Sequence, residues 1–158
     1  TLPKAKGLNR FVWDTRYPTM VGVPGVRIEG GFAAHKAPPG KYTIVLKMSG
    51  ESVSTDAEIL ANPLYPTTAP VYSTYHQTMS SMETELTAMH RMVNSLYEKQ
   101  KQLESLLGSL PAGMKFAAIK KDGDALLQKM KAWDEDMVQR KSKAYDEDEN
   151  FPDKFNAN

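Results

Sequence analysis

The spacing of apolar residues changes period near residue 62. Every second residue from 42 to 48 is apolar or aromatic, so these side chains share one face of an extended chain: Tyr42, Ile44, Leu46 and Met48. Ser49-Gly50-Glu51-Ser52 is a turn sequence. The alternation resumes after it with Val53, Thr55, Ala57 and Ile59. The pattern predicts a β-hairpin between residues 41 and 59.

A less regular strand is predicted upstream, within Gly7-Leu8-Asn9-Arg10-Phe11-Val12-Trp13-Asp14-Thr15-Arg16-Tyr17-Pro18. Phe11 and Trp13 would lie on one of its faces. Pro18, Pro24 and the pair Gly30-Gly31 then interrupt the chain. We therefore expect residues 15–39 to be mainly loop, with one more short strand between 26 and 34.

Residues 61–70 contain three prolines, Pro63, Pro66 and Pro70. Proline lacks an amide donor and fixes φ, so this stretch is predicted to be an extended linker. Beyond it, a seam of alternating 3- and 4-residue steps predicts a long helix, about 55 Å at about 1.5 Å per residue. The seam positions are Tyr72, Tyr75, Met79, Met82, Leu86, Met89, Val93, Leu96, Gln100, Leu103, Leu107 and Leu110.

A second helix is predicted after the breakers Gly108, Pro111 and Gly113. Its seam has the same spacing and consists of Phe116, Ile119, Gly123, Leu126, Met130, Trp133 and Met137. The short connection favours an antiparallel helical hairpin. Two helices alone leave apolar edges exposed, so we expect a third helix, the β-domain or a second copy to cover them.

The predicted fold class is α+β, with a small, incomplete immunoglobulin- or fibronectin-like β-sandwich followed by a long antiparallel α-helical hairpin. The predicted domains are a sandwich portion over 1–60, a proline-rich linker over 61–70, a helical hairpin over 71–145 and an acidic, aromatic tail over 146–158. We also expect further strands before Leu8 and a further helix after Asn158, so that both ends continue in a longer protein.

Composition narrows the classes of partner. Among 158 residues, 20 are basic and 19 acidic, which leaves a net charge of +1 and no electrostatic reason to expect nucleic acid or an anionic membrane. No cysteine is present, so disulfides and thiolate metal sites are excluded. No apolar run approaches 18 residues, so membrane insertion is not expected. Met is frequent, at nine residues, and a Met-rich helical face suits dimerisation or partner docking as well as plain packing.

Candidate chemistry is sparse, and we predict no catalytic, cofactor-binding or metal-ligating residue. Trp13, with Asp14, Arg16 and Tyr17, could form a sugar platform, but a mid-strand Trp is more often core, with Asp14 and Arg16 bonding turn backbone. Asp146, Asp148 and Asn150 match three positions of a calcium loop. Phe151 and Ala157 stand where that loop needs Gly and Glu, which favours a solvated charge run.

The histidines are His35, His76 and His90. On one straight helix His76 and His90 would lie about 21 Å apart, too far to share a metal. His35 lies in a loop beside Lys36, and no partner for a zinc triad or a Ser-His-Asp array is evident. The neighbours Asp134, Glu135 and Asp136 point in different directions on a helix and do not form a glycosidase pair. The glycines form no phosphate-binding loop.

The Gly7–Pro18 segment and Ala37-Pro38-Pro39-Gly40-Lys41-Tyr42-Thr43 resemble the C-terminal Ig-like module of the bacterial neuraminidase-repeat (BNR) and sortilin-type glycosidase-like proteins common in Bacteroidota. The order of a β-domain, a linker and helices is similar as well. In that family a segment resembling Asn150-Phe151-Pro152 introduces another helix. The Asp-box of the family's propeller (Ser-x-Asp-x-Gly-x-Thr-Trp) does not occur in this sequence.

The resemblance implies a non-catalytic accessory module that supports or positions the β-propeller of a secreted, periplasmic or cell-surface protein. Its partner would then be the rest of its own larger protein or another chain. Two alternatives stay open: a stand-alone interaction module whose Met-rich hairpin forms homo-oligomers or docks a partner, and a contributor to a glycosidase active site.

Overall fold

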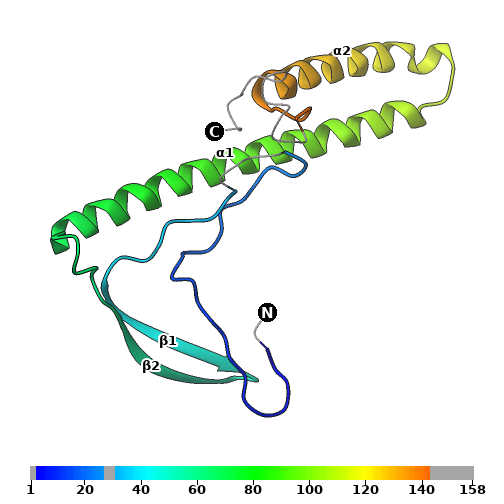
Figure 1. The fold of residues 1–158 in the computed structure, drawn as a ribbon. Helices are drawn as coiled ribbons and strands as arrows, with labels where there is room; N and C mark the ends of the chain where they lie inside the picture. Colours follow the sequence, from blue (N-terminus) through cyan, green and yellow to red (C-terminus); the bar gives the residue numbers. More distant parts are fainter. Residues whose placement is uncertain (1–2, 27–30, 143–158) are drawn as a thin grey trace. The chain divides into compact units, whose positions relative to one another are not determined.

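The computed structural model describes residues 3–26 and 31–142, and these residues form an α+β fold. In chain order they contain β1 (Gly40–Met48), β2 (Glu51–Ile59), α1 (Ala69–Ser109) and α2 (Met114–Met137) (Figure 1). The described residues fall into two compact units. One lies within 1–19 and 33–84, and the other within 20–32 and from 85 onward, so α1 supplies residues to both.

The predicted β-hairpin is confirmed. β1 and β2 pair in antiparallel register from Gly40 opposite Ile59 to Met48 opposite Glu51. Ser49 and Gly50 connect them with φ values of 49° and 89°. Two successive positive φ angles define the type I′ turn, whose twist matches that of the paired strands.

The hairpin has one apolar and one polar face. On the apolar face Leu46 lies opposite Val53, and both are exposed, at 50% and 70% of their surface. On the polar face Lys41 lies opposite Glu58, and the Thr43 hydroxyl donates a hydrogen bond to Asp56 at 3.2 Å. Opposite charges and hydrogen-bonding pairs directly across the strands stabilise such a sheet. The half of the apolar face nearer the turn is thus uncovered by the described residues, whereas Tyr42 and Ala57, at its other end, are half-buried.

The predicted strand around Phe11 and Trp13 is not formed, and only a single bridge, between Arg16 and Lys36, occurs there. The chain turns instead, because Thr15 adopts a left-handed conformation (φ 64°) and the Arg16 N–H bonds the Asp14 carboxylate at 3.0 Å. The predicted strand between 26 and 34 is also absent from Val26 and from residues 31–34, the described part of that range.

α1 begins at Ala69, inside the predicted linker, and ends at Ser109. The prolines of the linker were expected to exclude a helix, but Pro70 lies in the first turn, where its missing amide has no helical acceptor to lose. The first hydrogen bond of the helix is donated by the Tyr72 N–H to the Thr68 carbonyl, at 3.2 Å.

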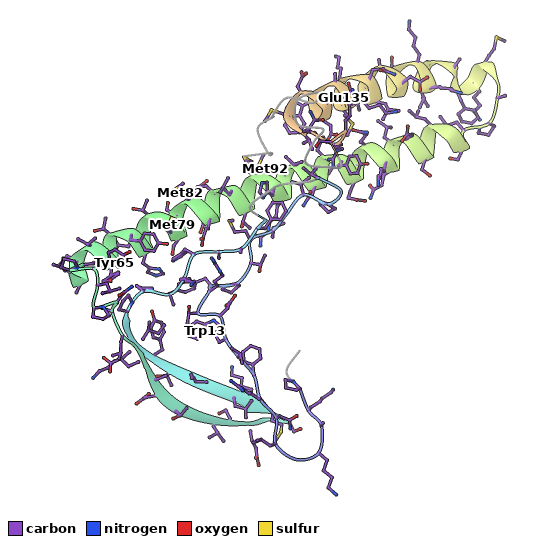
Figure 2. All side chains as sticks on the ribbon, viewed as in Figure 1. Trp13, Tyr65, Met79, Met82, Met92 and Glu135 are labelled. Atoms are coloured by element: carbon purple, nitrogen blue, oxygen red, sulfur yellow. The ribbon has the colours of Figure 1, made fainter. Side chains whose placement is uncertain are left out.

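The apolar seam of α1 is buried in only part of the helix. Val93, Gln100 and Leu107, seven residues apart, are buried. Tyr75 and Met82, which the seam also includes, are 45% and 54% exposed. Met82 and Met92 are both labelled along α1 in Figure 2, and Met92 is 72% exposed. Periodicity alone thus located the helix but not the extent of its buried face.

The buried face of α2 differs from the predicted seam. Leu127 and Asp134, which lie outside the seam, are buried. The seam positions Ile119, Leu126 and Trp133 are exposed, and the other four are half-buried. Asp134 can face inward because Arg140 neutralises it.

Two contacts join α2 to α1 within the second unit. Lys131 Nζ lies 2.7 Å from Glu104 Oε1, and Gly123 gives the Leu107 side chain room to approach α2. The apolar core of this unit is small: Val23, Val93 and Val138 are buried together, with Val26 and Met137 packed against them. No helix within residues 3–26 and 31–142 is long and apolar enough to cross a membrane.

Candidate functional site

The most concentrated set of polar contacts lies in the first unit, where a loop meets α1. His76, Ser80 and Glu83 follow one another at steps of four and three residues, which places them on one stripe of α1. His35 approaches this stripe from the segment that leads into β1. We refer to His35, His76 and Glu83 as the histidine cluster.

Glu83 holds His35 by three contacts. Its Oε1 accepts the backbone N–H of His35 at 2.6 Å, and both carboxylate oxygens lie 2.9 Å from His35 Nδ1. Because an ionised carboxylate only accepts, Nδ1 of His35 carries a proton. The imidazole orientation and the position of one proton are therefore fixed by Glu83.

The other nitrogen of His35 faces a second histidine. His35 Nε2 lies 2.9 Å from His76 Nδ1, and the Ser80 hydroxyl lies 3.5 Å from the same His76 nitrogen. A contact of this length is a hydrogen bond in which one nitrogen donates and the other accepts. The chain Glu83–His35–His76 is thus a continuous hydrogen-bond relay.

Aromatic rings enclose the relay. The Tyr17 ring lies 4.8 Å from the His35 ring and is stacked at 5.0 Å on His76, and Tyr75 meets His35 edge-on at 5.7 Å. The His35 side chain is only 1% exposed and that of Glu83 14%. Burial makes each hydrogen bond of the relay costly to lose without replacement.

Backbone bonds hold the loop that carries His35. The Tyr17 N–H donates to the His35 carbonyl at 3.1 Å, and the Ala37 N–H donates to the Thr15 carbonyl at 2.6 Å. The Arg16 guanidinium donates to the Ala34 carbonyl at 2.7 Å. These bonds pair residues 15–17 with residues 34–37, so His35 is held by this loop pairing as well as by Glu83 of α1.

The geometry suits proton sharing. The nitrogens of His35 and His76 that face one another are engaged with each other, and the remaining His35 nitrogen is engaged with Glu83. No group of three or more His, Cys, Asp or Glu side chains within residues 3–26 and 31–142 is arranged to hold a metal ion.

Sequence reasoning missed this cluster. It tested His76 against His90 and found no partner for His35, which lies 41 residues before His76. The available signal was the heptad spacing of His76, Glu83, His90 and Tyr97, a polar stripe beside the apolar seam. Which loop residue meets that stripe depends on the irregular backbone of residues 15–37, and no periodic pattern encodes that backbone.

In the second unit the same stripe holds another loop. His90 Nδ1 donates to the Val21 carbonyl at 2.7 Å, and Asn94 donates to the Gly22 carbonyl at 2.8 Å. The ring of Phe32 meets His90 edge-on at 5.4 Å. These bonds satisfy carbonyls of a loop that lacks sheet partners.

Arg140 forms the other polar clamp of this unit. It donates to both Asp134 oxygens, at 2.7 and 2.8 Å, and its guanidinium lies 3.9 Å from the centre of the Tyr97 ring. The hydrogen bond to Asp134 raises the pKa of Arg140 further above its ordinary value. This fixed cation explains the burial of Asp134. The calcium-loop candidates of the sequence, Asp146, Asp148 and Asn150, lie outside the described residues.

The aromatic candidate Trp13 is not in a core. It is 41% exposed, its Nε1–H donates to the Arg16 carbonyl at 2.9 Å, and its ring meets Tyr42 at 6.1 Å (Figure 2). Asp14 and Arg16 do bond turn backbone, as expected. The expectation that Trp13 would lie mid-strand in a core was thus wrong on both counts.

An open depression of about 450 Å³ lies on the hairpin, lined by Lys41, Tyr42, Thr43, Asp56, Ala57 and Glu58. Asp56 and Glu58 project from the same face of one strand. A glycosidase needs carboxylates on opposite sides of the scissile bond, which two neighbours on one strand do not provide. Partial burial, followed by the neighbouring Tyr17, raises the pKa of Tyr42.

No protein-family model, curated protein or solved structure matches the chain.

Proposed function

We propose that the chain is a non-catalytic accessory module that supports or positions a β-propeller in a secreted or surface glycosidase-like protein of the BNR and sortilin type. The single observation that supports this most is the exposure of Ile44, Leu46 and Val53 on the apolar face of the β1–β2 hairpin. The proposal also relies on the resemblance of the segments 7–18 and 37–43 to that family.

The hairpin in isolation buries too little to be stable. Ile44, Leu46 and Val53 are each at least half exposed on its apolar face. A lone two-stranded sheet is marginal in water, and a sheet with one apolar face normally packs that face on another layer. We infer that polypeptide beyond the described residues supplies the second layer, which would complete an Ig-like sandwich.

The helices would form the rigid part of the module. The contacts of Lys131 with Glu104 and of Gly123 with Leu107 join later residues of α2 to earlier residues of α1. Contacts in this order support the antiparallel helical hairpin that the sequence predicts. A hairpin of this kind could act as a strut between the β-domain and the propeller.

A second candidate function is helical association. Ile119, Leu126 and Trp133 form an exposed apolar stripe at seven-residue spacing on α2. Such a stripe is typical of helices that pack on another helix. If this function holds instead, the protein forms a concentration-dependent dimer in analytical ultracentrifugation, and Leu126→Glu abolishes it.

The accessory function is tested by site-specific photo-crosslinking in the whole protein that contains this chain. A crosslinker at Leu46, on the apolar face, is compared with one at Lys47, on the opposite face of the same strand. We expect Leu46 alone to give crosslinks, to peptides of a propeller or of a second sheet layer. Crosslinks between two copies of this chain, or equal yields at both positions, would contradict the proposal.

A further inference from the structure

We propose that the histidine cluster is an acid-sensitive latch for residues 34–37. It holds them on α1 while one proton lies between His35 Nε2 and His76 Nδ1, and it releases them when both rings are fully protonated. The proposal goes beyond the accessory function and does not depend on it. It rests on the geometry of the facing nitrogens and on the number of charges around them.

The proton count decides the behaviour of the pair. The 2.9 Å contact between His35 Nε2 and His76 Nδ1 needs one proton between two nitrogens. A neutral pair meets this condition, and so does a pair in which one ring is an imidazolium. A second added proton leaves two N–H groups facing each other, so the hydrogen bond becomes a repulsive contact.

The charges around the cluster balance one cation. From α1, Tyr75, His76 and Glu83 face His35, and Glu83 is the one anion among them. Ser80, also from α1, faces His76. From residues 15–17 the facing groups are the Tyr17 ring and Arg16, whose guanidinium bonds the Ala34 carbonyl. Glu83 thus compensates the first imidazolium, and no described neighbour compensates the second. With His35 only 1% exposed, water cannot screen it.

His90 provides an internal contrast. Its Nδ1–H donates to the Val21 carbonyl, an acceptor that cannot take a proton from it. Protonation of the other nitrogen of His90 leaves that bond intact. Acid should therefore affect the loop held by His35 and spare the loop held by His90.

Release has a structural consequence within the first unit. His35 and Ala37 lie five and three residues before Gly40, the first residue of β1. Loss of the His35 contacts removes the clamp that joins the base of the hairpin to the stripe of His76 and Glu83. The latch would therefore couple acidification to the freedom of the β1–β2 hairpin.

The test follows the intact protein from about pH 8 to about pH 4.5, the range in which histidine changes charge. Nitrogen NMR of the histidine rings reports each protonation step, and hydrogen exchange reports protection of the His35 amide after correction for intrinsic rates. We expect two separate proton-uptake steps, with the first leaving protection unchanged and the second reducing it by about tenfold or more.

Two variants complete the design. His76→Gln keeps a polar side chain that does not titrate, so the second step and its loss of protection should vanish or move to the acidity at which Glu83 protonates. His90→Gln should leave the response of the His35 amide unchanged. The proposal is overturned if wild type retains His35 protection with both rings fully protonated. An unchanged pH profile in a folded His76→Gln protein would overturn it as well.

Discussion

Gly123 is the position where one added methyl group tests the packing of the two helices most directly. An alanine Cβ there would lie 2.5 Å from Leu107 Cδ2, 3.2 Å from Cδ1 and 3.3 Å from Cγ. Rotation about χ2 of Leu107 moves the two methyl groups but leaves Cγ at 3.3 Å, so full relief needs a change of χ1 or a backbone shift. Leu107 is itself only 5% exposed, so it has little space to retreat.

Two opposing effects set the magnitude. Replacement of glycine by alanine within a helix stabilises by about 1 kcal/mol. Overpacking of a filled site costs about 1–3 kcal/mol. We therefore expect Gly123→Ala to lie between neutral and about 2 kcal/mol destabilising.

Gly108 is the matched control, because it lies in α1 and an added Cβ meets nothing within 4 Å. Gly108→Ala should stabilise by up to about 1 kcal/mol, which makes it more stable than Gly123→Ala by about 1–3 kcal/mol. Urea denaturation followed by circular dichroism measures both free energies of unfolding. Equal stabilisation by the two substitutions would refute the contact between Leu107 and α2.

Three further predictions concern single contacts. Val93→Asp should lower the free energy of unfolding by about 3 kcal/mol or more, because Val93 is 2% exposed. Met92→Asp, at a neighbouring residue that is 72% exposed, should change it by less than about 0.5 kcal/mol, and equal effects in thermal denaturation would contradict the core around Val93. Asp134→Asn should cost about 1–3 kcal/mol by weakening the charged hydrogen bonds of Arg140, and the loss should be absent in an Arg140→Ala background. Burial raises the pKa of Tyr42, so the folded protein binds the phenolic proton more tightly than the unfolded chain does, and the resulting stabilisation is present below pH 10 and lost as pH rises through the raised pKa. Ultraviolet titration of Tyr42→Phe should show one fewer late-titrating tyrosine than wild type.

The regular elements could be predicted because each depends on local chemistry. Alternation from Tyr42 to Met48 and the Ser49-Gly50 turn determine the hairpin, and the seam from Tyr72 onward determines α1. The strand predicted at Phe11 and Trp13 failed for a local reason as well, since Asp14 and Thr15 form a turn that competes with extension. The start of α1 was misjudged because Pro70 was treated as a helix breaker, although proline is compatible with a first turn.

The histidine cluster could not be predicted in the same way. Its α1 half is periodic, but its loop half is held by bonds between the irregular segments 15–17 and 34–37, and such pairings leave no repeat in the sequence. The burial of α2 is a similar case. Asp134 faces inward because Arg140, six residues later and outside the helix, neutralises it. A polar residue on a buried face is read correctly only when its partner is known.

In each unit polar side chains of α1 bind loop backbone, in the second unit beside the small core of Val23, Val93 and Val138. In the first unit the carboxylate of Glu83 takes the His35 amide, and in the second unit His90 and Asn94 bond loop carbonyls. Glu83, His90 and Asn94 lie at steps of seven and four residues, on one stripe of α1 beside the apolar seam. Loops that form no backbone hydrogen bonds with a neighbouring strand need such side-chain partners, so these loops contact the polar stripe rather than the apolar seam. Tyr75 and Met82 consequently remain exposed on α1, as Leu46 and Val53 do on the hairpin. Such surfaces beside well-formed polar clamps are what an accessory module would retain for a larger protein to cover.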